Sequence, residues 1–505
     1  MHSSSSRRTG GDLAAAAIVS AVVAVAFGRA FLDLFPLVEF RDWLAWSLSA
    51  EDAWRMAREV VLRDRLFSRN VSLGFVLWLG GVAGTSVPLV NVAVLLPIVV
   101  AAALLFALAR LLGLSRLDGV VVAWVWAFSL PVLEAAAWQA TIHDRFALVF
   151  ALACLLVALG RPHGDDRQAP AWRTALLATV FLILAYNSKE SAFFLAPALA
   201  ALALRPPRHR LRRRLASLAP ALLYAVFHNL RYATFLGDPA EATWSHHVLG
   251  GDREANALAA LRFVLGLDAS APSLLVTGAW LAILAAWGVG ITRSRVASGP
   301  GDHLLWLGVA FVGAMVIPLA AVHAPPYYVY LPRALLALLV VTALRTALGR
   351  PVGEGGRARL ATASVVGLLV AAGIAFLLVA QPTVARTLRY SENFERLRPD
   401  LAGCVEPAAW ENVELVFPQP FWKVYRFFLG PERPFYRWLL PSAILEAVTW
   451  DAEVDHSTDI DLASWTPTDP AILYVVFDES FGLEAVHHGG AVSTCSASTA
   501  EPALY

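Results

Sequence analysis

Apolar residues in this chain occur in long blocks separated by short polar segments. A helix needs about 20 mostly apolar residues to cross a bilayer, and fewer when it is buried among other helices. By this measure the pattern predicts about eleven spanning helices. They cover 13–32, 88–108, 119–133, 146–159, 174–186, 192–204, 215–227, 272–291, 304–321, 331–348 and 360–380. The chain is therefore predicted to be an all-α polytopic membrane protein.

The arginines predict how these helices are oriented. Alternate connections, at 110–116, 161–173, 205–214, 293–295 and 345–359, are rich in arginine, and under the eleven-span count they all fall on one side. Short opposite loops, near Thr141 and Pro325, are nearly free of it. Because cytoplasmic loops carry an excess of Lys and Arg, the arginine-rich side is predicted to be cytoplasmic. The protein is then predicted to lie in the inner or plasma membrane, with its N-terminus in the cytoplasm.

Two domains follow from this pattern. Residues 1–380 form the predicted transmembrane domain, with a first outer loop at about 33–87. Within that loop, 51–67 has apolar residues at three-to-four spacing, which predicts an amphipathic helix on the bilayer surface or packed on the protein. An odd number of spans places 381–505 on the outer, extracytoplasmic side of the membrane. Alternating runs at 413–417 and 471–477 predict a small α/β or mainly β domain there, in a compartment that permits a disulfide between Cys404 and Cys495.

Composition supports the membrane interpretation and excludes other classes. Hydrophobic residues make up 58% of the 505 residues and charged residues 16%, whereas soluble domains average about 45–50% and about 25%. The net charge is +1, so no bulk field attracts nucleic acid. All but two of the 40 basic residues are arginines, the exceptions being Lys189 and Lys423. A lysine that persists in so arginine-rich a chain is a candidate for a specific role.

Ionisable and aromatic polar side chains gather at the predicted outer ends of the spans. Such groups are costly in a membrane and are functional candidates by default. They are Glu39 and Asp42 after the first span, Glu134, His143 and Asp144 between the third and fourth, Lys189 and Glu190 between the fifth and sixth, Arg231 after the seventh, and Tyr327, Tyr328, Tyr330 and Arg333 at the tenth. A transporter would more naturally carry such groups near mid-membrane, so their position favours an enzyme at the outer interface.

Several motifs, in order along residues 1 to about 350, resemble those of the GT-C glycosyltransferases, most closely the protein O-mannosyltransferase-like enzymes. They are Glu39-Phe-Arg-Asp-Trp43, Val90-Asn91 before an apolar helix, the run from Pro131 through Trp138 to Leu148, Ser188-Lys189-Glu190 before an apolar run ending at Pro197, and Tyr327-Tyr-Val-Tyr-Leu-Pro332. Arg41 stands where the family has the first acid of a pair, and Tyr327 where it has an arginine. The sugar and the acceptor therefore stay open.

The resemblance implies a GT-C-like fold and an inverting transfer of a sugar from a polyprenyl phosphate to an acceptor hydroxyl on a glycan, lipid or protein. This chemistry needs a base near the hydroxyl and positive charge on the departing phosphate. Asp42 is the candidate base, with Glu39 as the alternative. Lys189 is the candidate for the phosphate, assisted by His143, Arg231 and Arg333.

The remaining candidates would bind substrate. Glu134, Asp144 and Glu190 could shape the acceptor site or orient cations, and Tyr327, Tyr328 and Tyr330 could stack on the sugar or the prenyl chain. Each has a plainer alternative: a helix cap for Asp42, an ion pair with Glu190 or Asp144 for Lys189, and an interfacial aromatic belt for the tyrosines. No obligatory metal or other cofactor is expected, although two carboxylates with His143 are compatible with a divalent ion.

Two other functions remain open at this stage: a transporter or flippase of lipid-linked sugars, and a non-catalytic protein on a GT-C scaffold. Replacement of Asp42 by Asn separates the enzyme from the scaffold. Loss of a general base should lower sugar transfer by about 10²- to 10⁴-fold, while the protein stays folded on gel filtration in detergent. Transfer at the wild-type rate would exclude Asp42 as the base.

Overall fold

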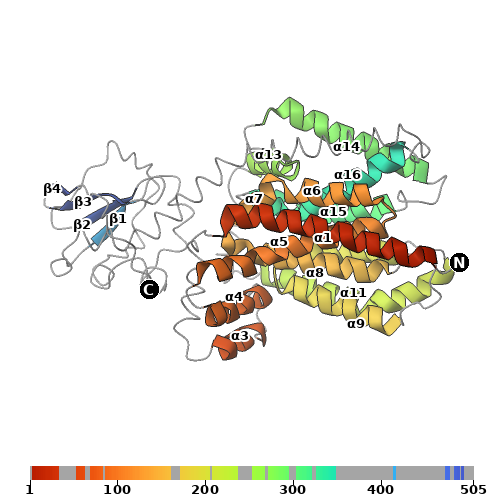
Figure 1. The fold of residues 1–505 in the computed structure, drawn as a ribbon, viewed down its shortest axis with the longest axis horizontal. Coiled ribbons are helices and arrows are strands. Elements are labelled where there is room, and N and C mark those ends of the chain that lie inside the picture. Colours follow the sequence, from red (N-terminus) through yellow and green to blue (C-terminus); the bar gives the residue numbers. More distant parts are fainter. Residues whose placement is uncertain are drawn as a thin grey trace. The chain divides into compact units, whose positions relative to one another are not determined.

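The computed structural model describes residues 3–32, 53–62, 69–83, 86–160, 171–204, 208–236, 253–267, 271–294, 303–320, 326–348, 413–416, 473–477, 483–488 and 491–493. The helical elements shown in Figure 1 are α1 (Ser3–Phe31), α3 (Ala53–Leu62), α4 (Asn70–Ala83), α5 (Val87–Leu111), α6 (Arg116–Ala127), α7 (Leu130–Ala137), η1 (Gln139–Thr141), α8 (Ile142–Leu159), α9 (Ala171–Tyr186), η2 (Glu190–Phe194), α10 (Leu195–Leu204), α11 (Arg208–Leu236), α13 (Arg253–Val264), α14 (Ser273–Ser294), α15 (Leu304–Ala320), η5 (Pro326–Val329) and α16 (Tyr330–Leu348). The strands are β1 (Val413–Val416), β2 (Leu473–Phe477), β3 (Leu483–His488) and β4 (Ala491–Ser493).

The predicted class, a mainly helical protein with several apolar helices, is confirmed. Each of the first ten predicted spans overlaps a described helix, and the eleventh, 360–380, lies outside the described residues. Within the described ranges, five helices are long and apolar enough to cross a membrane, and the bent pair α6 and α7 would make a sixth. They are Gly11–Phe31, Val87–Leu111, Gln139–Leu159, Ser273–Arg293 and Pro326–Ala347.

The chain divides into two compact units. One comprises Met1–Ala30, Val61–Leu73 and Ala93–Ala380, and the other comprises Phe31–Val60, Gly74–Val92 and Gln381–Tyr505. The first unit holds the charged residues described below. The two predicted domains, 1–380 and 381–505, stay a prediction, because most of the second lies outside the described residues.

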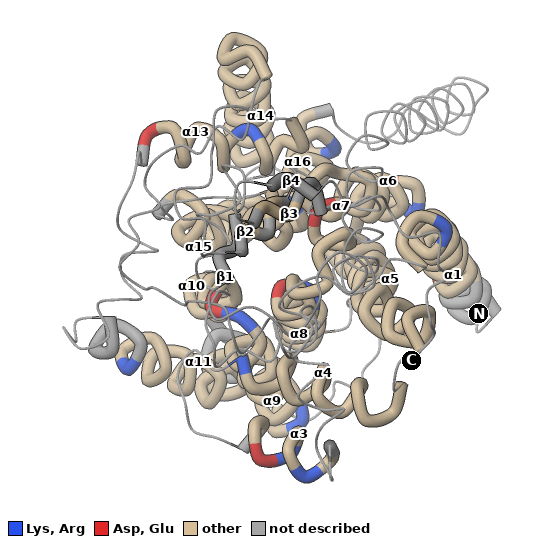
Figure 2. The backbone as a smooth tube through the Cα atoms, turned by 90° about the vertical axis from the view of Figure 1, so that its left-hand side faces the viewer, with Lys and Arg blue, Asp and Glu red and all other residues tan. Residues whose placement is uncertain are grey.

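The first unit is a helical bundle whose apolar residues face both inward and outward. Helix α8 packs on α9, α9 on α11, and α16 on α6, α14 and α15. Ile98, Leu105 and Leu155 are fully buried, whereas α14 leaves Leu274 85% and Leu281 62% exposed. Charged residues are sparse along these helices (Figure 2). Exposed apolar surface of this kind suits hydrocarbon rather than water.

The second unit contains a small sheet among its described residues. The strand order is β1-β2-β3-β4. β1 pairs with β2 in parallel, from Val413 opposite Leu473 to Val416 opposite Val476, and the other two pairs are antiparallel. β1 and β2 coincide with the two runs whose alternation predicted strands. A parallel pair requires a crossover connection, which the 56 residues between Val416 and Leu473 supply.

The helices near the charged residues bend where the sequence requires it. Ser115 and Asp118 form a capping box that starts α6. Helices α6 and α7 meet at 55°, with a proline in the first turn of α7. That proline is Pro131, which lacks an N–H and so begins a new helix rather than continuing the old one. Helix α7 then ends after eight residues, and η1 leads directly into α8.

Arg145 holds this broken region together. Its side chain is fully buried, and it donates to the carbonyls of Val94 at 2.6 Å, Trp138 at 3.1 Å and Ala135. The last carbonyls of a helix lack partners within the helix, and inside a membrane no water replaces them. Arg145 therefore caps α7 and ties it to α5 and α8.

Replacement of Arg145 by Met should destabilise the protein by about 3 kcal/mol, because several buried carbonyls lose their charged donor. The free energy of unfolding can be measured in mixed detergent micelles. The matched control is Arg173→Met, which removes an exposed arginine stacked at 5.3 Å on Trp172 and should cost no more than about 1 kcal/mol. Equal losses in the two variants would contradict this role of Arg145.

Candidate functional site

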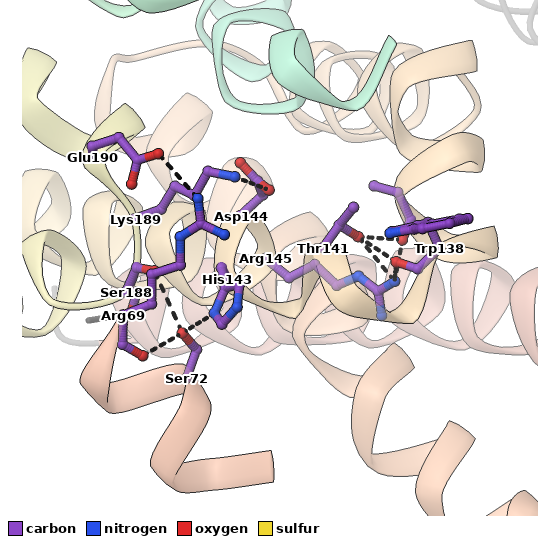
Figure 3. Close-up of polar contacts among 11 residues, drawn as sticks. Arg69, Ser72, Trp138, Thr141, His143, Asp144, Arg145, Ser188, Lys189 and Glu190 are labelled. Atoms are coloured by element: carbon purple, nitrogen blue, oxygen red, sulfur yellow. Dashed lines mark hydrogen bonds and ion pairs between the residues drawn. The ribbon is translucent and has the colours of Figure 1, made fainter. Parts of the chain in front are cut away.

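Four charged side chains meet at the start of α8, beside the turn that joins α9 to η2 (Figure 3). They are Arg69, Asp144, Lys189 and Glu190, and we call them the charge cluster. Asp144 lies in the first turn of α8, where the helix dipole favours a negative charge. Arg69 immediately precedes α4. Residues separated by more than 100 positions in the sequence are thus brought together.

The centre of the cluster is an ion pair between Lys189 and Asp144. Lys189 Nζ lies 3.1 Å from Asp144 Oδ2, and the side chains are 10% and 4% exposed. The ring of Tyr328 lies against the same ammonium, at 5.4 Å from its centroid. The ion pair with Asp144, one of the alternatives that the sequence left open for Lys189, is therefore present. An ammonium has three N–H donors, so this single bond does not exhaust it.

A second ion pair joins Arg69 to Glu190, with 3.3 Å between Nη2 and Oε1. Both side chains are more exposed than the first pair, at 30% and 19%. Lys189 has an extended backbone that precedes η2, so its side chain and that of Glu190 take different partners. Arg69 itself has a φ of 46°, in the left-handed region that costs a residue with a Cβ about 1 kcal/mol or more.

Ser72 fastens the start of α4 to the other two segments. Its hydroxyl contacts Nδ1 of His143 and lies 3.1 Å from the carbonyl of Arg69 and 3.4 Å from that of Ser188. The backbone N–H of Val71 donates to the carbonyl of Asn187 at 3.1 Å. His143 is buried beneath these contacts. It therefore lies next to the cluster, where it positions Ser72.

The formal charges of the cluster do not cancel once Arg145 is included. Arg145 follows Asp144 on α8 and interacts with it electrostatically, while its hydrogen bonds go to neutral oxygens. Arg69, Lys189 and Arg145 give three positive charges and Asp144 and Glu190 two negative ones, which leaves an excess of one positive charge among these described residues. Three cations placed this close together favour a further negative charge nearby.

The other predicted site residues are more dispersed. Tyr327 and Tyr328 stack edge to face at 5.3 Å. Arg333 donates to the carbonyls of Val264 at 2.9 Å and Val125 at 3.3 Å, so it ties the end of α13 to α6. Glu134 lies half-buried in α7 and Arg231 half-buried near the end of α11, and their roles stay predictions.

Tyr330 is completely buried, and its carbonyl accepts a hydrogen bond from Trp126 at 3.3 Å. This burial does not fit an interfacial belt. Asp42 and Glu39, the two candidate bases, lie outside the described residues, so their predicted role is untouched by this geometry.

Arg69 and Ser72 were missed by sequence reasoning. The one available signal was weak: Arg69 directly precedes the apolar run of α4, in a predicted outer loop that holds five other arginines. No group of three or more His, Cys, Asp or Glu side chains suited to a metal ion occurs within the described ranges.

Comparison with known proteins finds a likeness among solved structures but none by sequence. The sequence matches no family model, and no curated protein matches it by sequence. Among solved structures, the chain is similar to ArnT from Cupriavidus metallidurans, in a crystal structure bound to undecaprenyl phosphate. The TM-score is 0.42 at 16% identity, over 83% of this chain and 84% of ArnT.

The Lys189–Asp144 pair can be tested by removing its charges singly and together. Lys189→Met leaves a buried, unpaired carboxylate and should destabilise the protein by about 3 kcal/mol. The double variant Lys189→Met with Asp144→Asn removes both charges and should recover most of that loss. Unfolding in detergent measures both. If the double variant is no more stable than the single one, the two groups are not coupled as the structure has them.

Proposed function

We propose that this protein is a membrane-bound glycosyltransferase that takes a sugar from a polyprenyl-phosphate donor. The observation that carries the proposal is the charge cluster with its nearly buried Lys189, to which the adjacent Arg145 adds a formal excess of one positive charge among these described residues. A sugar linked through a phosphodiester carries one negative charge. Such a headgroup would balance the excess, and its prenyl chain would lie along the exposed apolar helices.

Lys189 is the proposed contact for the donor phosphate. Its remaining donors can bond a phosphate oxygen while its ammonium lies against the Tyr328 ring. During transfer, negative charge grows on the departing phosphate, and a fixed cation stabilises it most where water is excluded. Arg69, the more exposed cation of the cluster, would add to the same field.

The acceptor side of the reaction rests on residues outside the described ranges. Asp42 is the proposed base that removes the proton of the acceptor hydroxyl, with Glu39 as the alternative, as the motif resemblance implies. Attack on the sugar carbon opposite the phosphate inverts the configuration. The acceptor is a hydroxyl of a glycan, lipid or protein, and the reaction is proposed for the outer face of the membrane, with the N-terminus in the cytoplasm.

The proposal draws on this chain's own residues rather than on the likeness to ArnT. A TM-score of 0.42 is too low for the ligand of that protein to argue for a ligand here. The ordered motifs over residues 1 to about 350 and the charge cluster are independent of it. Undecaprenyl phosphate is nevertheless a suitable probe, because it joins a phosphate to a long prenyl chain.

Binding of that probe to the purified protein tests the proposal. Native mass spectrometry after addition of undecaprenyl phosphate should show a lipid adduct on the wild-type protein. The double variant Lys189→Met with Asp144→Asn should lose most of it, with apparent affinity at least about tenfold lower, because a charged hydrogen bond to phosphate disappears.

A matched control removes a different ion pair of the same type. Arg345 Nε lies 2.6 Å from Asp118 Oδ1, at the opposite end of α16 from Tyr328. The variant Arg345→Met with Asp118→Asn should keep the adduct. Equal retention of lipid by both double variants would sink the assignment of Lys189, and with it the donor site.

A further inference from the structure

Buried polar groups near the charge cluster include two, on α16 and α8, that have no hydrogen-bond partner within the described part of the chain. They are the hydroxyl of Tyr330 and Nε of Arg145, and both residues are completely buried. A buried hydroxyl without a partner costs stability, so a structure that keeps one calls for an explanation. The nitrogen belongs to a guanidinium whose terminal N–H groups are fixed on carbonyls of α5, of α7 and of the residue after α7. The phenol hydroxyl is freer, because its hydrogen can rotate to meet an oxygen.

The Tyr330 hydroxyl is close enough to interact electrostatically with both Asp144 and Arg145. Tyr330 is the first residue of α16, which packs against α8, the helix of Asp144. Two residues earlier, Tyr328 lies against the ammonium of Lys189. The same short segment therefore presents one aromatic ring to the lysine and one unused hydroxyl to the region of its carboxylate partner.

The carboxylate is the group that a phosphate would disturb. Asp144 has one side-chain hydrogen-bond partner among the described residues, which is Lys189 at 3.1 Å. A phosphate oxygen that binds the remaining donors of Lys189 draws on the same positive charge and repels the Asp144 carboxylate. A second donor would then stabilise Asp144, because a buried carboxylate is strongly disfavoured unless its charge is compensated.

We infer that Tyr330 is a positioning residue that donates its hydroxyl hydrogen to Asp144 when the donor phosphate engages Lys189. This inference rests on the proposed function. It gives the buried Tyr330 hydroxyl a function, as the reserve partner of Asp144. It also gives Tyr330, the innermost tyrosine of its motif, a task different from stacking on substrate.

Replacement of Tyr330 by Phe tests the inference on the full-length protein in detergent, with undecaprenyl phosphate as the probe. Without lipid, the unfolding temperature should not fall, because the variant removes a hydroxyl that bonds nothing described. With lipid, the affinity should fall about tenfold, since a hydrogen bond to a charged group is lost only in the bound state. If Tyr330 only filled space, its replacement by Phe would not lower the lipid affinity while leaving the unfolding temperature unchanged.

Thr342→Val is the matched control. Thr342 lies on the same helix, is completely buried, and also has a hydroxyl without a partner among the described residues. Its removal should leave lipid affinity unchanged. The third variant is Asp144→Asn, in which a neutral amide stands where the carboxylate was. In that background, Tyr330→Phe should have almost no further effect on affinity.

The outcomes separate the inference from the proposed function. If Tyr330→Phe binds lipid like the wild type while the Lys189 and Asp144 double variant does not, the role of Tyr330 is overturned and the donor site stands. An equal loss with and without the Asp144 carboxylate also overturns it, because the hydroxyl then acts elsewhere. If the Lys189 and Asp144 double variant retains the lipid, the proposed donor site fails, and the inference fails with it.

Discussion

The cost of burying charge is the constraint on which this helical unit depends. Inside a bilayer, carbonyls at helix ends and ionised side chains cannot turn to water, so each needs a partner from the chain. Arg145 donates hydrogen bonds to carbonyls of the broken α7 region, and Lys189 donates one to the Asp144 carboxylate. Among these described residues, the same two cations and Arg69 outnumber the carboxylates of Asp144 and Glu190 by one. Structural support and affinity for an anion are thus properties of one set of side chains.

This shared use explains why single substitutions in the cluster are difficult to interpret. Removing one charge changes both the stability of the fold and the field at the site. Paired replacements that remove both members of an ion pair separate these effects. They restore the stability of the fold without restoring the electrostatic field at the site. The principle extends to Arg69 and Glu190, whose pair lies closer to solvent and whose removal should disturb the fold less.

Much of the helical architecture could be predicted from the sequence. Blocks of apolar residues gave the approximate positions of ten described helices, because a spanning helix must hide its backbone whatever its neighbours are. Alternation at 413–417 and 471–477 likewise found β1 and β2. Of the residues predicted to lie at the same ends of the spans, Lys189 contacts both Asp144 and Tyr328.

Other features could not be found this way. Spacing disfavours Glu190 as a partner of Lys189, because adjacent residues point apart. It could not decide between an ion pair with Asp144 and a free lysine, which depends on how α8 packs beside η2. Arg333 was a candidate for phosphate, but it bonds the carbonyls of Val264 and Val125, an outcome that depends on tertiary packing. Arg69 was missed because its contact with Glu190 spans 121 positions.

The backbone of Arg69 has a consequence for attempts to stabilise this protein. Its left-handed conformation favours glycine, and to a smaller degree asparagine, over arginine. A library screened only for thermal tolerance would therefore be drawn towards small residues at position 69, and each improved clone would have discarded a cation of the cluster. A substitution at this one position would then raise thermal stability and lower affinity for an anionic headgroup. Selections on this protein therefore need to score stability and binding together.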